Sequence, residues 1–318
     1  MKRTLLGITA ISCVLLALSY GVIIAEEDSE SPAPSASESQ SPSVSPSASP
    51  SESPKVSLPP FEPFDHELEI GEKHVYEIAY RGFAAGTGAI EVVGRGLLPA
   101  PFYKVQMTAK SSKFVELLYP VKDTFISHIH GSKGYALQFE RHMREGRNAK
   151  NFRDETIVYD YSKMKAFYNS KKDKGGKVKE YEKPLQSKVL DPLSAVMYLR
   201  ALEPEVGKTY KFPMHSSDED WVLKLKCVGL VGLRVTGVGK FNAWKLEPET
   251  KEDALFTSNG AMKMWIEKET KVVLRAEVDV PIGSIVVRMI RAENSPLEDV
   301  NRQEKRRRWI RPGTREIP

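Results

Sequence analysis

The chain has 318 residues, a formal net charge of +5 and two cysteines, Cys13 and Cys227. Two cysteines are too few for a disulfide framework, a structural zinc site or an iron–sulfur cluster. Only residues 61–300 have the composition to bury a core, and a body of that length folds without cross-links or a bound metal. The sequence therefore predicts one large domain, with no cofactor and no metal site.

The positive charge is concentrated at the end of the chain. The first 25 residues carry two bases, residues 26–60 carry six acids and one lysine, and residues 301–318 carry seven bases and two acids. Residues 61–300 are left with 37 bases and 34 acids, which nearly cancel. A general nucleic-acid binder concentrates basic residues on its folded part, so the charge distribution argues against nucleic acid as a partner.

Residues 1–25 have the pattern of an export segment. Lys2 and Arg3 are followed by an uncharged stretch, residues 4–25, and then by Glu26. The pattern predicts a signal peptide, and the alternative is an uncleaved anchor, since 22 residues as a helix span about 33 Å. Both interpretations predict export to the periplasm or cell envelope, and the second leaves the protein anchored to the inner membrane.

Residues 26–60 and 301–318 are not expected to form a core. The first segment contains thirteen Ser and eight Pro, which predicts a disordered spacer. The basic tail combines Arg306, Arg307 and Arg308 with Trp309. Such a tail is predicted either to bind an anionic membrane surface, with the Trp in the interface, or to remain solvated and disordered.

Alternation with a period of two recurs along residues 61–300. Tyr103, Val105 and Met107 alternate with polar residues, as do Leu223 and Leu225, so each segment has one apolar face. Leu274 and Val278 follow the same pattern further along. One-sided strands are typical of antiparallel sheets, because the strands of parallel sheets are covered on both faces. We count about a dozen such strands.

One segment is predicted to be a helix. Asp191 is a candidate N-cap, Pro192 occupies the first helical position, and residues 193–202 are apolar on almost every side, which indicates a buried helix. About twelve helical residues span only about 18 Å and cannot cover a dozen strands. We therefore predict a mainly β protein, in which a large curved antiparallel sheet, an open barrel or clam, wraps around one buried helix.

Several short segments resemble, in pattern and order, the exported bacterial domain-of-unknown-function family 3108. They are Gly71–Tyr80, Gly86–Gly88, Leu118–Asp123, Asp191–Ala195, Tyr198–Arg200, Met264–Ile266 and Pro281–Ser284. The resemblance extends over about residues 66 to 292 and includes no catalytic motif. It implies an exported envelope protein of no established activity. It also implies a fold similar to the half-barrel of lipoprotein carriers, whose concave face holds acyl chains.

The first hypothesis is a non-enzymatic envelope protein that binds or carries a lipid or acyl chain, or a lipoprotein, in its concave sheet. A sheet of this size is expected to leave room for such a guest. The candidate lining residues are the core-facing ones: Tyr103, Val105, Met107, Leu193, Met197, Leu223, Leu225, Met262, Met264, Leu274 and Val278.

Arg200 interrupts the apolar helix, and a buried guanidinium needs a partner. Either it forms an ion pair with a carboxylate of the sheet, such as Asp123 or Glu77, or it meets the headgroup of a bound amphiphile.

Two other functions remain open. The protein could be a structural or interaction module of the envelope with a dry core, acting through its outer surface or tail. It could also be an envelope hydrolase that uses the carboxylates of residues 218–220 beside Trp221. A metal site at His128 and His130 is not predicted, because a functional site needs three or four ligands.

Overall fold

The structure is a computed structural model that describes residues 58–61, 67–97, 99–149, 151–216, 218–249, 262–280 and 283–302. The export segment at residues 1–25, most of the Ser/Pro-rich spacer and the four tail residues Arg306, Arg307, Arg308 and Trp309 lie outside the described residues. Within the described part of the chain, no helix has the length and apolar character needed to cross a membrane.

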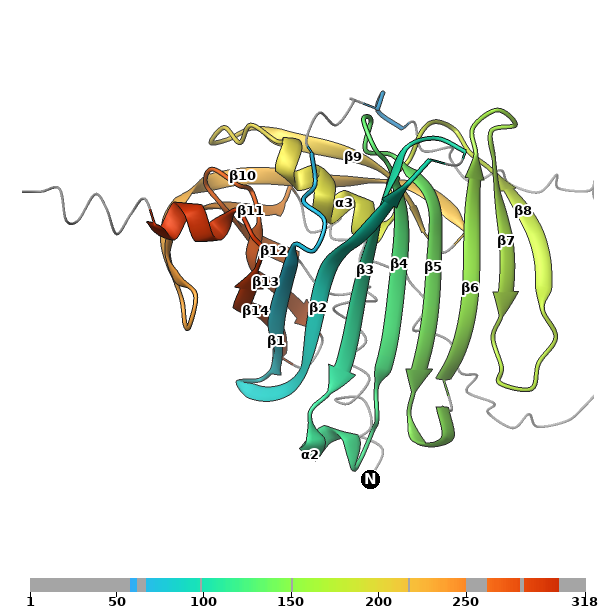
Figure 1. The fold of residues 1–318 in the computed structure, drawn as a ribbon, viewed down its shortest axis with the longest axis horizontal. Helices are drawn as coiled ribbons and strands as arrows, with labels where there is room; N and C mark the ends of the chain where they lie inside the picture. Colours follow the sequence, from blue (N-terminus) through green and yellow to red (C-terminus); the bar gives the residue numbers. More distant parts are fainter. Residues whose placement is uncertain are drawn as a thin grey trace, which may run out of the picture.

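Fourteen strands form one antiparallel sheet (Figure 1). The strands are β1 (Lys73–Tyr80), β2 (Phe83–Gly96), β3 (Phe102–Ser111), β4 (Lys122–His130), β5 (Ala136–Glu145), β6 (Asn151–Asp160), β7 (Lys165–Lys171), β8 (Lys179–Pro184), β9 (Thr209–Ser216), β10 (Glu219–Val235), β11 (Gly239–Pro248), β12 (Met262–Glu267), β13 (Val273–Val280) and β14 (Gly283–Glu293).

The sheet consists of two meanders joined at β1 and β14. The strand order is β8-β7-β6-β5-β4-β3-β2-β1-β14-β13-β12-β11-β10-β9. Strands that are adjacent in the sheet are therefore also consecutive in the sequence, except for β1 and β14. The two edges are β8 and β9, and the sheet is not closed into a barrel. The chain passes from one edge to the other through residues 185–208, which contain the main helix.

The predicted helix is present as α3 (Pro192–Tyr198), followed by a 3-10 turn, η2 (Leu199–Ala201). The Asp191 carboxylate accepts hydrogen bonds from the backbone N–H groups of Leu193 and Ser194, at 2.8 and 2.9 Å, and so caps the helix. Shorter helical pieces were not predicted: α2 (Lys113–Glu116), η1 (Arg147–Ala149) and residues 297–302. Each of these described pieces is too short to produce a recognisable helical periodicity in the sequence.

The inner segment, residues 189–202, lies between the two halves of the sheet, and α3 is packed against β3, β4 and β9 (Figure 1). Three of the hydrophobic clusters each contain part of it. Val189 and Leu193 belong to the cluster on β3–β7, Met197 to a cluster with Leu68 and Val105, and Leu190 and Leu199 to the cluster on β9–β14. The inner segment therefore fills the concave side of both meanders.

The fold class predicted from the sequence is confirmed. The predicted core-facing residues of β3 and β10 are buried and alternate with less buried ones. The sheet curves around α3 as the shortage of helix requires, because a single short helix covers its apolar face only if the strands bend over it.

A change at Gly86 is expected to destabilise this sheet. A Cβ at Gly86 would lie far inside van der Waals distance of the Lys110 carbonyl oxygen on β3, where backbone must shift. We expect Gly86→Ala to lower the free energy of unfolding by about 1–3 kcal/mol. Gly94, on the same strand, has no described atom within 4 Å of an added Cβ. Gly94→Ala is expected to be neutral or slightly stabilising. Urea unfolding of both variants checks the difference, and equal losses would contradict it.

Candidate functional site

The interior of the sheet collects most of the apolar side chains proposed from the sequence as ligand-lining. Tyr103, Val105 and Met197 lie in one cluster, and Met107 and Leu193 in a second. The third cluster holds five more: Leu223, Leu225, Met262, Met264 and Val278. All ten are buried, with exposed fractions of 7% or less. They surround the inner segment or belong to it.

Leu274 is the exception among the apolar candidates. It is buried in a separate cluster with Tyr76, Phe241, Met289 and Leu297, which contains no residue of the inner segment. A register shift between Trp265 and Ile266 changes the pairing of β12 with β13 beside Leu274. The regular alternation assumed from the sequence therefore does not extend to this residue.

A small void and a larger open hollow lie among the described residues. A void of about 10 Å³ lies beside the inner segment, lined by residues that include Tyr76, Met197 and Arg200. Such a volume admits about one water molecule. A larger hollow of about 410 Å³ is lined by residues of β6, β7 and β8 and opens to solvent. The inner segment occupies the part of the concave side that lies between the two meanders.

Asp191 holds the N-terminal end of the inner segment in place. Its carboxylate accepts a hydrogen bond of 2.6 Å from the Ser127 hydroxyl on β4, in addition to the two helix-capping bonds. Burial raises the pKa of Asp191 to about 6, although the bonds from Ser127 and Ser194 oppose the rise. The helix cap therefore also attaches α3 to the middle of the first meander.

The second end is held by Arg200. Its Nη1 lies 2.7 Å from Oε2 of Glu72, just before β1, and both side chains are buried. His74 lies 3.3 Å from Glu72 and 2.8 Å from the Ser295 hydroxyl. Burial, together with the charge of Arg200, lowers the pKa of His74 to about 3. Burial raises the pKa of Glu72, and this effect is larger than the opposite effect of Arg200, which lowers it.

The sequence-based expectation that Arg200 pairs with a carboxylate was right in kind, but Asp123 and Glu77 were the wrong partners. Glu77 instead lies against Arg288 on β14, and Asp123 accepts a hydrogen bond from the backbone N–H of Arg144. Glu72 was missed because it precedes the strand and is 128 residues away from Arg200. Only the folded arrangement brings these two residues together.

The two free edges of the sheet meet through side chains and through the inner segment. His215 on β9 contacts the Tyr168 hydroxyl on β7 through Nε2, and its Nδ1 lies 2.6 Å from the Asp220 carboxylate. Tyr181 on β8 donates a hydrogen bond to Asp218. Leu190 forms a parallel bridge with Met214 on β9. The edges therefore lack the continuous backbone hydrogen bonds found between the other strands.

The carboxylates proposed for a hydrolase serve these edge contacts. Asp220 accepts bonds from His215 and from the backbone N–H of Gln186, and Asp218 accepts from Tyr181. Trp221 donates to the Ser216 hydroxyl. The hydrogen bonds of these side chains therefore connect strands with one another and with the chain that follows β8. His215, fully buried at the centre of this arrangement, was not singled out in the sequence, since a single histidine between Met214 and Ser216 forms no distinctive pattern.

A buried ion pair on the concave side of β5–β7 also escaped sequence analysis. Arg141 lies 2.5 Å from Glu155, which further contacts Arg153 at 2.6 Å and the Ser170 hydroxyl at 3.0 Å. Burial alone would raise the pKa of Glu155, but Arg141 and Arg153 hold it below its ordinary value. The neighbouring Tyr159 hydroxyl is buried without a hydrogen-bond partner among the described residues. The apolar interior therefore contains a further polar region at β5–β7, besides those at Asp191 and Arg200.

Two further acids lie together near α2. Asp123 is buried, and burial followed by the charge of Glu145 raises the pKa of Asp123 to about 7. Glu145 accepts a hydrogen bond from the Tyr119 hydroxyl. In the part of the chain that the structure describes, no cluster of three or more histidines, cysteines or acids is suited to a metal ion. The ring of His128 stacks on Phe102, and the ring of His130 makes a tilted contact with Tyr135.

One family model matches this chain, over residues 75–290, and its description is Protein of unknown function (DUF3108). No curated protein matches the chain.

Three solved structures are similar in outline. A β-barrel-like protein of the domain of unknown function DUF1849 from Brucella abortus is 6% identical, covers 74% of this chain and 98% of its own, and has a TM-score of 0.44. A protein with a YmcC-like fold from Bacteroides fragilis is 11% identical, over 73% of this chain and all of its own, with a TM-score of 0.28. A hypothetical protein from Chlamydia trachomatis is 12% identical, and the match covers 71% of this chain and 87% of that protein, also with a TM-score of 0.28.

The raised pKa of Asp123 predicts a specific pH dependence of stability. Between pH 4 and about 7 the folded state retains a proton that the unfolded chain has released, so this group makes stability fall as the pH rises through that window. Asn imitates the protonated acid. We therefore expect Asp123→Asn to be more stable than the wild type by more than about 1 kcal/mol at pH 8, with a much smaller difference at pH 5.

Urea unfolding at the two pH values measures this difference. Asp173→Asn, in the exposed turn between β7 and β8, is the control and should not alter the pH dependence. If Asp123→Asn were less stable than the wild type at pH 8, the carboxylate would be contributing favourably there and its pKa could not be raised.

Proposed function

This chain belongs to the family described as Protein of unknown function (DUF3108), a description that names no activity, and we propose that it is a non-enzymatic carrier of an apolar chain. The guest, an acyl group or a molecule of similar shape, occupies the concave side of the sheet in exchange for part of the inner segment. Export to the cell envelope is part of the proposal and rests on residues 1–25, which lie outside the described residues.

The observation that carries the proposal is the position of the inner segment. Its apolar side chains, Leu193 and Met197 among them, complete three clusters that otherwise belong to the sheet. An extended hydrocarbon chain in the same place would bury against the same side chains, at roughly 25 cal/mol per Å² of apolar surface. The sheet thus offers a long apolar surface whose present occupant is a single short stretch of chain.

The edges of the sheet provide a route for the exchange. β9 meets the end of the first meander through side-chain contacts, such as that of His215 with Tyr168 on β7, so the two edges of the sheet can separate without breaking a strand pair. The hydrogen bond of Asp191 with Ser127 and the ion pair of Arg200 with Glu72 oppose the exchange. Breaking a buried ion pair such as the second costs about 3–5 kcal/mol. Without a guest the inner segment therefore stays inside.

A second candidate is an interaction module of the envelope with a dry core. The observation in its favour is the burial of the inner segment, whose side chains belong to three hydrophobic clusters of the described interior. In this alternative the inner segment is permanent packing, and the protein acts through its outer surface.

The two candidates are distinguished by weakening the inner segment. Leu193 and Leu297 are both fully buried, but Leu193 belongs to the inner segment and Leu297 to the cluster that lacks it. Replacing a buried Leu by Ala costs about 2–5 kcal/mol. If a guest displaces the segment, Leu193→Ala should tighten binding of a dansyl-labelled fatty acid to the full chain by at least about tenfold, since 1.4 kcal/mol is a factor of ten.

Leu297→Ala is the matched control, expected to lower stability by a similar amount without changing the affinity. Fluorescence titration gives the affinities and urea unfolding confirms that both variants are folded. Absence of binding by the wild type and by Leu193→Ala, together with native mass spectrometry that finds no copurifying lipid, would contradict the carrier and favour the dry module.

A further inference from the structure

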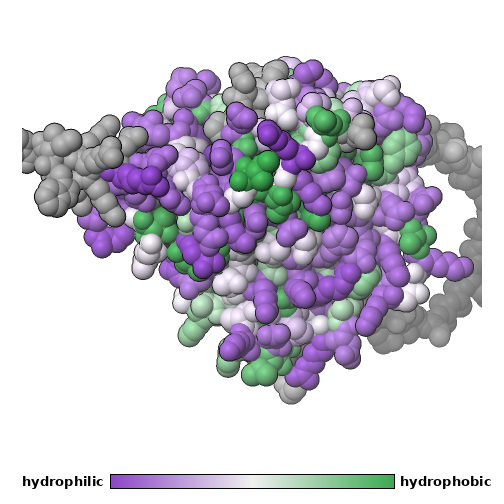
Figure 2. Space-filling model, in the orientation of Figure 1, coloured by the Kyte–Doolittle hydropathy of each residue, from purple (hydrophilic) through white to green (hydrophobic). Residues whose placement is uncertain are grey.

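A small apolar surface lies at one end of the sheet, where the β1–β2 turn meets the connection between β3 and β4. Four large hydrophobic side chains are strongly exposed there: Phe83 by 80%, Phe114 by 73%, Leu117 by 71% and Leu118 by 56%. We call these four residues the apolar tip. Figure 1 shows α2 and the β1–β2 turn at the lower end of the sheet, and Figure 2 shows hydrophobic atoms at that end among hydrophilic ones.

The backbone that carries the apolar tip is fixed by several contacts. The Ser112 N–H donates to the Ala85 carbonyl at 2.8 Å, which joins the start of α2 to β2. Arg147 donates to the Leu117 carbonyl at 3.0 Å, and Asn151 donates to the Tyr119 hydroxyl at 2.7 Å. The exposed side chains are therefore held outward by the fold. A group of large, strongly exposed apolar side chains marks a surface that contacts a partner or a membrane.

The surroundings of the apolar tip are positively charged. Between residues 81–88 and 110–122 the sequence contains four bases, Arg81, Lys110, Lys113 and Lys122, and a single acid, Glu116. Two more acids near α2, Asp123 and Glu145, are buried and do not contribute to the exposed charge. All four bases are exposed, and none has a carboxylate within ion-pair distance among the described residues. Lys110 is paired directly with Lys122 across β3 and β4, an arrangement that is unfavourable without an anion nearby.

We infer that the apolar tip inserts into the surface of an anionic lipid bilayer, with the surrounding bases against the lipid phosphates. Hydrophobic side chains enter the interface and cations remain at the level of the headgroups, which is the arrangement that this end of the molecule provides. The charge favours an anionic membrane over a neutral one.

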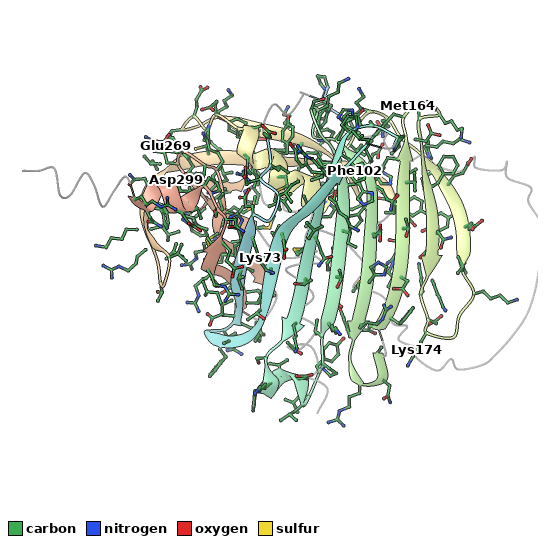
Figure 3. All side chains as sticks on the ribbon, viewed as in Figure 1. Lys73, Phe102, Met164, Lys174, Glu269 and Asp299 are labelled. Carbon is green, nitrogen blue, oxygen red and sulfur yellow. The ribbon has the colours of Figure 1, made fainter. Side chains whose placement is uncertain are left out.

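The shape of the surface also favours a membrane over a protein partner. The side chains around α2 project from the end of the sheet opposite Phe102 and Met164 (Figure 3), and so form a projection rather than a groove. A stable protein interface requires about 800 Å² on each partner with a complementary shape, whereas a bilayer accepts a narrow projection of any outline.

A label at the tip tests the inference locally. In the full chain with Cys13→Ser, the buried Cys227 is protected, so Leu117→Cys can be labelled with an environment-sensitive fluorophore. Vesicles of phosphatidylcholine with about one-third phosphatidylglycerol should raise its emission and shift it to shorter wavelength. Val206→Cys, which is 66% exposed in the turn before β9, is the matched control and should not respond. This local readout is insensitive to vesicle binding by residues 1–25 or by the basic tail.

The charges are tested with a triple variant. Lys110→Gln, Lys113→Gln and Lys122→Gln together should weaken vesicle binding at the Leu117 label by at least about tenfold. The same changes at exposed Lys174, Lys177 and Lys179 serve as the control, and no effect is expected there.

No response of the label at position 117 to these vesicles would overturn the inference. An equal response to vesicles of phosphatidylcholine alone would overturn its electrostatic part. Neither result depends on whether the interior binds a fatty acid, so this test is independent of the proposed carrier function.

Discussion

The apolar face of the fourteen-stranded sheet has to be covered, and this chain supplies only one short helix to do so. The sheet resolves this constraint by bending until both meanders face the inner segment, residues 189–202. Leu190, Leu193 and Met197 each enter a different hydrophobic cluster, so one stretch of chain completes the core of both halves. Burial of apolar surface thus determines the curvature, the location of the core and the site at which a guest would bind.

Polar contacts then determine how firmly the inner segment is held. Asp191 is bonded to Ser127 on β4, and Arg200 is paired with Glu72 before β1, so each end of α3 is attached to the first meander. β9 is joined to the end of the first meander by side chains: His215 contacts Tyr168 on β7, and Tyr181 on β8 donates a hydrogen bond to Asp218. The backbone ladder that stabilises the rest of the sheet is missing at this seam. Under the proposed function, the two edges separate at this seam to admit a guest.

The sequence was sufficient to predict features that depend on residues close together in the chain. The alternation along Tyr103, Val105 and Met107 predicted a one-sided strand, and the cap at Asp191 predicted the start of α3, because both patterns follow from the geometry of one element. Contacts between distant residues were not predictable. The partner of Arg200, the role of His215 and the packing of Leu274 depend on how separate strands meet, and so does the exposure of Phe83 beside α2. The position of the inner segment was likewise not predictable in detail, because it depends on how the two meanders face each other.

Hydrogen exchange of the inner segment tests the central claim most directly. The Ala195 amide is bonded to the Asp191 carbonyl at 2.9 Å, inside a buried helix, and should exchange slowly in the free protein. If an apolar guest replaces this segment, saturating fatty acid should speed the exchange of amides in residues 193–199 while those of β3 and β4 stay protected. Fatty acid that binds without altering the exchange of residues 193–199 would contradict the account, because the guest would then lie elsewhere.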